Sequence, residues 1–123
     1  MTNLLNIVEV AKMCSKVYLA AMIDGEGSVV FQQKKQNRFI AIYSSENQII
    51  QNCIDCLNTL NISYYVVKTK KQCTHGEFLQ LTISNQANLM KLHRCISMLL
   101  CERKKALFND LIGSYKYRKH LLS

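Results

Sequence analysis

The stretch "LAAMIDGEGS" at residues 19–28 constrains this chain more than any other part of its sequence. A nearly apolar run ends in two acids, Asp24 and Glu26, which alternate with Gly25 and Gly27. A carboxylate is favoured at the N-terminus of a helix, where the helix dipole is positive, but these two stand at the C-terminal end of one. The stretch therefore predicts a compensating partner beside this helix end: a lysine, a bound cation or a hydrogen-bond donor.

Hydrophobic periodicity predicts the elements on either side of this stretch. A short helix over residues 3–13 precedes a second one, which begins at a Ser15 cap and ends at about Asp24, where Gly25 and Gly27 stop it. Further helices are predicted at about 46–60, 85–100 and 102–120, and strands at 28–35, 38–45, 63–71 and 77–84. The order α-β-β-α-β-β-α-α predicts an α+β fold over a single domain, residues 1–123. It consists of a four-stranded antiparallel sheet with helices on one face, and Leu99 and Leu107 are among the helix residues expected to be buried.

The charge balance points to the kind of partner. The chain carries 16 Lys and Arg against 8 Asp and Glu, a formal net charge of +8, which favours a polyanion. The second face of the predicted sheet has no cover, so it is either an ordinary solvated surface or a β-ribbon that enters a DNA major groove. On the second interpretation, the predicted DNA-contacting residues are Ser28, Val30, Gln32, Lys34, Lys35, Arg38, Tyr43, Lys68, Lys70, Lys71 and Gln80.

A membrane or secreted protein is not expected. No apolar run approaches the roughly 18 residues that span a bilayer. Glu9, Lys12 and Lys16 interrupt the apolar pattern of the N-terminal segment, which therefore lacks the uninterrupted middle of a secretory signal. We therefore expect an intracellular protein with no membrane partner.

Six cysteines then have two interpretations. Reduced cysteines usually behave as small buried hydrophobes. Alternatively, Cys53, Cys56, Cys73 and His75 have a spacing that could hold a structural zinc ion. The first two cysteines fall in a predicted helix without a turn-forming glycine or proline, which favours buried thiols.

The opening stretch carries a family resemblance. Five of its residues, Leu19, Ala20, Ile23, Asp24 and Gly27, match the nine-residue signature of the LAGLIDADG homing endonucleases, and Glu26 stands in the second acidic place. A serine and an apolar strand follow the motif, as is typical of this family, and the order of elements is similar over residues 15–115. The chain departs from the signature at Ala21, where a glycine is usual.

The resemblance implies a fold, an activity and an assembly. It implies the LAGLIDADG homing endonuclease fold, with a saddle-shaped sheet, and an intron-encoded, site-specific endonuclease that cuts double-stranded DNA across the minor groove of a long, pseudo-palindromic target. A single motif, at residues 19–27, implies a homodimer through Leu19, Ala20, Ala21 and Ile23 of the motif helix. The cofactor implied is Mg²⁺ or Mn²⁺, and an organellar (mitochondrion or chloroplast) or viral origin is consistent with it.

Particular residues take roles from the same resemblance. Glu26 is the expected catalytic metal ligand, with the carbonyl of Gly25 beside it, whereas Asp24 is expected to be structural and to hold the helix end or turn amides. Two further catalytic positions are expected: Glu46 at a site that is usually polar, and a lysine near the start of a late helix. Arg103, Lys104 and Lys105 compete for the second of these positions.

Two other functions stay open at this point. The first is a non-cleaving nucleic-acid-binding protein of the same fold, either an RNA maturase or a DNA-binding regulator. The second is a small α+β domain that binds an acidic protein. Retention of Glu26 favours the endonuclease, because a protein that only binds gains nothing from paired acids beneath a polyanion.

Overall fold

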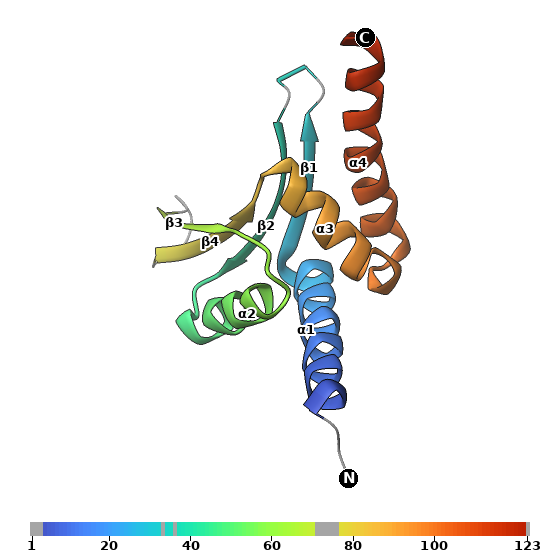
Figure 1. The fold of residues 1–123 in the computed structure, drawn as a ribbon. Helices are drawn as coiled ribbons and strands as arrows, with labels where there is room; N and C mark the ends of the chain where they lie inside the picture. Colours follow the sequence, from blue (N-terminus) through green and yellow to red (C-terminus); the bar gives the residue numbers. More distant parts are fainter. Residues whose placement is uncertain (1–3, 33, 36, 71–76, 123) are drawn as a thin grey trace.

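The computed structural model describes residues 4–32, 34–35, 37–70 and 77–122. Helices and strands follow one another in the predicted order α-β-β-α-β-β-α-α, with a 3₁₀ turn between the last two helices (Figure 1). The elements are α1 (Leu4–Glu26), β1 (Gly27–Gln32), β2 (Asn37–Ser44), α2 (Asn47–Thr59), β3 (Tyr65–Lys70), β4 (Glu77–Ile83), α3 (Gln86–Ile96), the 3₁₀ turn η1 (Ser97–Leu99) and α4 (Glu102–Leu122). The fold class predicted from the sequence, α+β with one antiparallel sheet, is confirmed.

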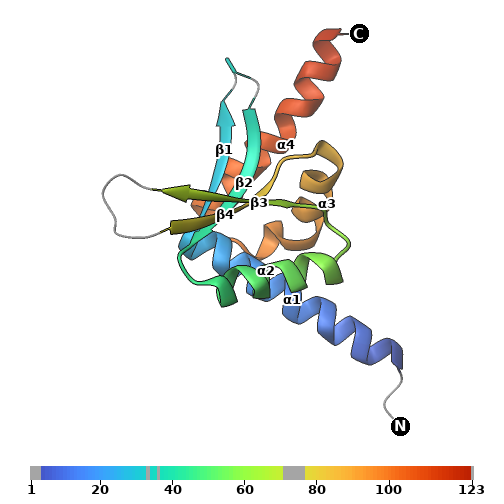
Figure 2. The ribbon, with the colours of Figure 1, turned by 90° about the vertical axis from the view of Figure 1, so that its left-hand side faces the viewer.

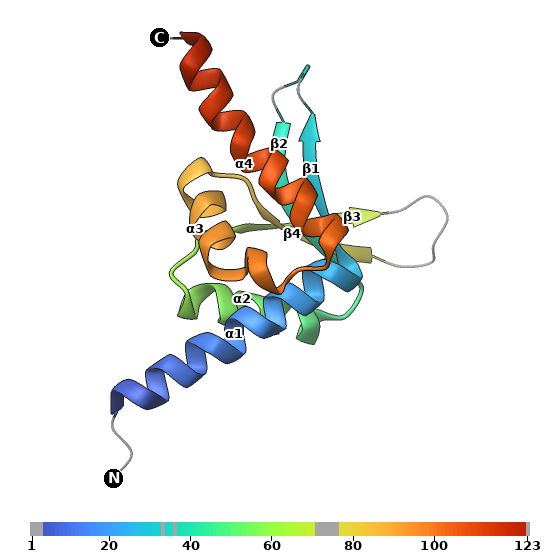
Figure 3. The same ribbon diagram turned by 90° about the vertical axis from the view of Figure 1, so that its right-hand side faces the viewer.

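The first helix is longer than predicted. The structure has one continuous α1 in place of two helices, so the predicted cap at Ser15 is wrong. Ser15 lies inside the helix and is buried, and no glycine or proline precedes it to interrupt the helix. Gly25 does not stop the helix either, since α1 continues to Glu26 and β1 begins at Gly27. The first half of α1 extends away from the rest of the molecule (Figure 3), and residues 6–14 are all exposed.

The sheet has the strand order β1-β2-β4-β3, with antiparallel pairing throughout. It is strongly twisted, because the β3–β4 hairpin runs across the direction of the β1–β2 hairpin (Figure 2). Seen with the sheet toward the viewer, the helices lie behind or below it (Figure 2), so one face is covered and the other is open. This arrangement is the saddle that the family resemblance implies.

The hydrophobic core lies between the covered face and the helices. Its centre is formed by Ile40, Ile42 and Leu81 of the sheet, and by Leu19 and Phe108 of the helices, which are all fully buried. Two predicted core residues, Leu99 and Leu107, are instead partly exposed. Leu99 is exposed because α3 ends at Ile96 and the 3₁₀ turn that follows changes the direction of its side chain.

In α4 the buried stripe contains Phe108 in place of the predicted Leu107, whereas Leu111 is buried as predicted. The stripe consists of Lys104, Phe108 and Leu111, at the i, i+4, i+7 spacing of one helix face. The prediction for Leu107 was wrong because only apolar residues were assigned to the buried face of this helix, whereas that face contains a lysine. This difference decides which basic residue of α4 points into the molecule.

The open face of the sheet is defined by the strand register, since residues directly opposite each other point to the same side. Its described members are Ser28, Val30, Gln32, Asn37, Phe39, Ala41, Tyr43, Tyr65, Val67, Thr69, Phe78, Gln80 and Thr82. None of them is charged. The small residues Ala41 and Thr82 at its centre are almost inaccessible, as larger neighbours on the same face surround them.

The register corrects three basic residues predicted to contact DNA from this face. Lys68 is opposite Leu79 and Lys70 is opposite Glu77, so both positions share the parity of the covered face. Arg38 is opposite Phe31, whose side chain packs on the core, and is itself buried. The sequence could not determine which face of the sheet each residue of β3 occupies, because apolar residues stand at both odd and even positions of this strand. A slip of one residue in the pairing exchanges the two faces. Lys71 lies outside the described residues.

No helix within the described residues is long and apolar enough to cross a lipid bilayer. Beside its exposed apolar side chains, α1 carries exposed charges, among them Glu9 and Lys12.

Candidate functional site

The motif at residues 19–27 forms the junction between α1 and β1. Gly27 is needed there because a Cβ atom at this position would lie 2.8 Å from Cα and 2.9 Å from the carbonyl oxygen of Ile23, and 3.2 Å from the carbonyl oxygen of Ala41. All three are backbone atoms, which cannot turn aside as a flexible side chain can. Gly27 thus lets the end of α1 pack directly on the sheet, and this contact fixes the position of Glu26.

One of the two acids at the end of α1, Asp24, has a hydrogen-bond donor as its partner. Its two carboxylate oxygens accept hydrogen bonds from the backbone N–H of Cys101, each at 3.1 Å. Cys101 precedes α4, and its carbonyl accepts the backbone N–H of Lys105 at 2.8 Å, so Asp24 lies at the positive N-terminus of that helix. The dipole of α1 disfavours this carboxylate and the dipole of α4 stabilises it. Asp24 thus has a structural role, because it binds the amide of the turn before α4.

A lysine supplies the second compensating partner. The ammonium of Lys104 donates to the carbonyl oxygen of Gly27, and the side chain is only 7% exposed. A cation at this place is favourable because the carbonyls at the end of a helix carry the negative end of its dipole. Among the residues that the structure describes, Arg103 and Lys105 make no such bond. Lys104 is therefore the one basic residue of this triplet that reaches the motif.

Glu26, in contrast, has no protein partner in the described part of the chain. It is exposed at the last position of α1, and no hydrogen bond or ion pair holds its carboxylate. The neighbouring Gly25 is open as well, since a Cβ there would meet nothing within 4 Å. One helix end therefore presents a carboxylate that no described residue compensates, next to a glycine with open space beside it.

These oxygen donors suit one class of metal ion. Carboxylate and carbonyl oxygens are hard ligands, which Mg²⁺ and Mn²⁺ accept. A single chain supplies too few of them, because the described residues contain no group of three His, Cys, Asp or Glu side chains that could hold a metal ion. The donor set fits such an ion only if a second copy of the chain or a bound phosphate completes it.

Glu46 lies at the same end of the first hairpin as Glu26. Antiparallel pairing of Gly27 with Ile42 returns the end of β2 to the level of the α1–β1 junction, and Glu46 follows β2 by two residues. It occupies the N-cap position of α2, its side chain makes no capping bond, and its backbone N–H donates to Ser44 Oγ at 3.0 Å. The exposed carboxylate is thus not used in holding the helix.

The structure corrects the predicted dimer residues. Leu19, Ala20 and Ile23 are buried in the core of their own chain and have no surface to offer a partner. Ala21 is exposed, and it continues a stripe along the other side of α1, at helical spacing. We define this α1 stripe as Ile7, Val10, Met13, Cys14, Val17, Ala21 and Gly25, all of which are exposed and none of which is charged.

The part of this stripe N-terminal to the motif is not among the residues predicted from the sequence. Val10, Met13 and Val17 expose between 51% and 62% of their surface. These residues follow the 3.6-residue period of a helix when it is counted back from Ala21. They were not predicted as one stripe because the sequence was interpreted as two separate helices. The 3₁₀ turn η1 adds Met98, which is 85% exposed, to the apolar surface of the molecule.

Arg38 holds the β1–β2 hairpin against α4. Its Nε donates to Ser114 Oγ at 2.6 Å, and its guanidinium lies 4.6 Å from the ring centroid of Tyr115 and 5.5 Å from that of Phe31. Ser114 in turn donates to the carbonyl of Leu111. Arg38 is therefore a structural residue, and this removes it from the predicted DNA-contacting set.

The cysteines of α2 behave as buried thiols. Burial, with a smaller contribution from the charge of Cys56, raises the pKa of Cys53 to about 12. Burial also raises the pKa of Cys56, although a hydrogen bond from Ser15 acts in the opposite direction. Zinc binds thiolates, which these shifts disfavour at neutral pH. The other two residues of the zinc hypothesis, Cys73 and His75, lie outside the described residues.

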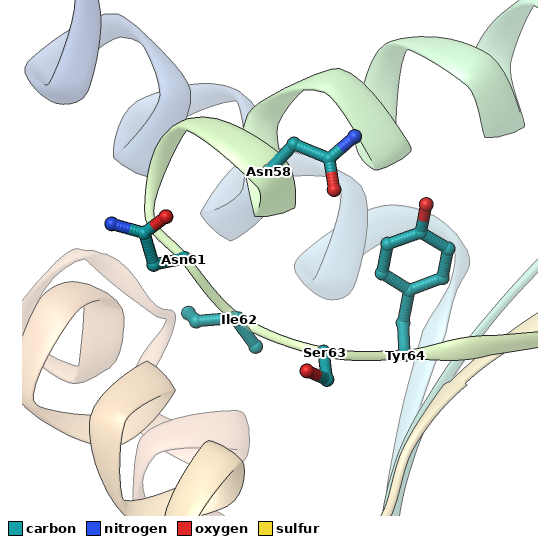
Figure 4. Close-up of a pocket in the computed structure, with 5 residues that line it drawn as sticks. All are labelled: Asn58, Asn61, Ile62, Ser63 and Tyr64. Atoms are coloured by element: carbon teal, nitrogen blue, oxygen red, sulfur yellow. The ribbon is translucent and has the colours of Figure 1, made fainter.

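A shallow pocket of about 380 Å³ opens between the end of α2 and β3 (Figure 4). It is lined by Asn58, Asn61, Ile62, Ser63 and Tyr64. No charged side chain lines it, and β3 is the edge strand farthest from β1 in the sheet order. The pocket is thus separate from the helix end that carries Glu26.

Comparisons with known proteins agree with this geometry. Residues 14–97 match the sequence profile of the family described as LAGLIDADG-like domain. No curated protein sequence matches the chain. One similar solved structure is the homing endonuclease I-CvuI in complex with an I-CreI target in the presence of Mg, with uncleaved DNA; the identity is 13% and the TM-score 0.58, over 83% of this chain and 66% of that one.

A second is I-CvuI in complex with its own target in the presence of Ca, at 13% identity and a TM-score of 0.58, over 85% of this chain and 67% of that one. The chain thus spans about two thirds of the length of these structures, and the likeness shows the shared fold. Because the sequence match covers the motif helix, the whole sheet and α3, the chain belongs to the LAGLIDADG-like domain family.

Proposed function

We propose that this protein is a site-specific, metal-dependent DNA endonuclease that acts as a homodimer. The observation that carries the proposal is Glu26, an exposed carboxylate at the end of α1, next to the first strand of the open sheet, with no partner among the described residues. In that part of the chain Asp24 and Lys104 already compensate the helix ends, so no structural use of the Glu26 carboxylate is seen there. The fold and the resemblance to homing endonucleases support this proposal.

The α1 stripe is the proposed dimer surface. A contact across a two-fold axis is self-complementary, so two α1 helices that pack through Val10, Val17 and Ala21 end at the same level. The ends of this pair bring the two Glu26 carboxylates close together, with Gly25 at the contact, where the absence of a side chain allows close approach. The buried Leu19 and Ile23 hold each helix to its own sheet and so fix the distance between the two sheets.

The paired helix ends supply the oxygen donors that one chain lacks. Two Glu26 carboxylates repel each other, and a divalent cation relieves this repulsion. When bound, Mg²⁺ or Mn²⁺ would polarise a phosphate and lower the pKa of a bound water. The residues of this chain would hold it through Glu26 and the Gly25 carbonyl, and Lys104 would keep the Gly27 carbonyl in place beneath. The exposed Glu46 is available to position water at the same end of the hairpin, with Lys105 at the margin of the site.

Double-stranded DNA would lie on the two open faces. Each face follows a major groove, with the paired acids beneath the minor groove between them, so the target would be long and roughly palindromic. Lys34 and Lys35, exposed in the β1–β2 turn, and Lys68 at the sheet edge would meet phosphates, whereas uncharged side chains such as Tyr43 would meet bases.

A non-cleaving protein of the same fold is the second candidate, an RNA maturase or a DNA-binding regulator. One observation favours it: no metal-holding group of three side chains exists within the described part of one chain, so a chain that does not dimerise could bind nucleic acid without cutting it.

Cleavage and binding, measured together, test the proposal. Plasmid DNA that carries the insertion locus of the gene is incubated with the protein and Mg²⁺ or Mn²⁺, and affinity is measured in Ca²⁺. Glu26→Gln keeps the shape of the side chain but removes its charge, so we expect cutting to be lost while binding is retained or strengthened. Glu9→Gln, the same change in the exposed arm of α1, is the matched control and should cut normally.

Asp24→Asn separates the two acids of the motif. It weakens the contact with Cys101, so we expect lower stability or weaker dimers as its main effect. Cleavage by Glu26→Gln at the wild-type rate would place the metal site elsewhere. Tight binding by the wild type without any cutting would select the non-cleaving alternative, and a preference for RNA would identify the maturase form of it.

A further inference from the structure

The open face of the sheet is chemically unusual for a basic protein. The chain has a formal net charge of +8, yet the described open face contains no Lys, Arg, Asp or Glu. Register accounts for this difference. Lys68 is on the covered-face parity, Lys34 and Lys35 are in the turn beyond the strands, and the Arg38 guanidinium is fixed between Phe31 and Tyr115.

The missing side chains are the ones that read G·C pairs in a major groove. Arg and Lys donate two bonds to guanine O6 and N7, and Asp or Glu accepts from cytosine N4. Adenine is instead read by the paired donor and acceptor of Asn or Gln, and the thymine methyl by an apolar contact. The open face has both of the latter, amides at Gln32, Asn37 and Gln80, and apolar groups that include Val30 and Val67.

All three amides take part in side-chain hydrogen bonds. Asn37 Nδ2 donates to Gln32 Oε1 at 3.2 Å across the β1–β2 pair, and Gln80 Nε2 donates to Thr82 Oγ1 at 3.2 Å. A held amide loses less conformational entropy when it binds a base edge than a freely rotating side chain does. Gln32 is exposed and Gln80 half-buried, so each retains surface toward a partner on this face.

The spacing of the strand matches that of base pairs. Each residue of a strand advances about 3.3 Å, and each base pair about 3.4 Å along the duplex. Alternate residues on the open face, Ser28, Val30 and Gln32, therefore meet about every second base pair. Ser28 follows the motif helix, so it faces the centre of the target, and Gln32 faces outward toward the hairpin turn.

From this composition we infer that the part of each half-site read by the strands is rich in A·T pairs. This inference rests on the proposed function and names its substrate class. It concerns the inner positions of each half-site, since the turn that carries Lys34 and Lys35 lies beyond the strands. Gln32 reads adenine at the position that it faces, and a change of this A·T pair to G·C weakens binding roughly 5- to 100-fold.

A selection from a random double-stranded DNA library tests it. The full chain is used in Ca²⁺, and the bound DNA is sequenced. We expect A·T pairs to be enriched at the inner positions of two inverted half-sites. Gln32→Arg should change the preference to guanine at one position in each half-site. Gln48→Arg on α2, away from the open face, adds the same charge and should leave the selected bases unchanged.

Three outcomes would overturn the inference: G·C pairs at the inner positions, no base preference there, or the same new preference in Gln32→Arg and Gln48→Arg. In all three the protein still binds DNA, so the proposed function stands. A protein that retains no library DNA overturns the proposed function and the inference together.

Discussion

At the scale of single residues, the two acids of the motif differ because of what surrounds them. Asp24 and Glu26 are two positions apart on one helix, so they point in different directions. The first meets the N–H of Cys101 at the start of α4, and the second meets no described protein group. Lys104 completes the junction through the carbonyl of Gly27. An acidic side chain is therefore a structural group at position 24, whereas the one at position 26 is exposed and makes no bond to the described residues.

Lys104 gives a test of this junction. Lys104→Met keeps the length of the buried side chain but removes the bond to Gly27, so we expect a loss of about 1.5–3 kcal/mol in the free energy of unfolding, the usual contribution of a charged hydrogen bond. Lys105→Met, one position along the same helix, is the control and should change stability by less than about 0.5 kcal/mol. Urea unfolding measures both, and equal effects of the two variants would contradict the structural role of Lys104.

At the scale of elements, α1 has two apolar sides with different uses. One side, which contains Leu19 and Ile23, packs on the sheet of its own chain, and the α1 stripe on the other side is exposed. Large exposed apolar patches commonly mark association sites in folded proteins. The proposed dimer uses this stripe, and the same helix ends at Glu26.

The two glycines of the motif test these two sides separately. Gly27→Ala places a Cβ 2.8 Å from a backbone atom of Ile23, so we expect it to destabilise each chain by about 1–3 kcal/mol. Gly25→Ala meets nothing in its own chain and should leave the chain as stable as before or stabilise it by up to about 1 kcal/mol. In a dimer, however, it separates the helix ends, so sedimentation should show weaker association. A Gly25→Ala variant that associates as tightly as the wild type would exclude this glycine from the dimer contact.

At the scale of the whole molecule, exposed lysines and the uncharged open face are separated in space. The open face is uncharged in its described part, while lysines lie in the β1–β2 turn and at the sheet edge. Phosphates run along both sides of a groove and bases lie at its floor. A sheet with uncharged centre and basic margins therefore matches the chemistry of a duplex.

Salt dependence tests this separation. A dimer that contacts about 6–10 phosphates should lose roughly 10³–10⁵ in affinity between 50 and 200 mM salt. Replacing both Lys34 and Lys35 by Gln should lower the steepness of this dependence without changing the preferred bases. Lys91→Gln is the control, because that ammonium bonds to the carbonyl of Asn61, away from the open face. A nearly flat response of the wild type would argue for a partner other than nucleic acid.

The sequence by itself determined the order of elements, the motif and the positions of its two acids. These follow from local rules: period-two and period-3.6 patterns, and the need for glycine where backbones pack closely, as at Gly27. It also showed that two carboxylates stand at the unfavourable, C-terminal end of a helix, and which kinds of group could stabilise them there. The role of Glu26 as a catalytic metal ligand was inferred from the resemblance and stays a prediction.

Only the tertiary structure decided which faces these residues occupy. The register of β3 moved Lys68 off the open face, the contact with Ser114 buried Arg38, and the stripe of α4 selected Lys104 over its neighbours. Likewise the sheet covered Leu19 and Ile23 and left Val17 and Ala21 exposed. A local pattern shows that a helix or strand has two sides, but which side meets the rest of the chain depends on contacts between residues far apart in the sequence.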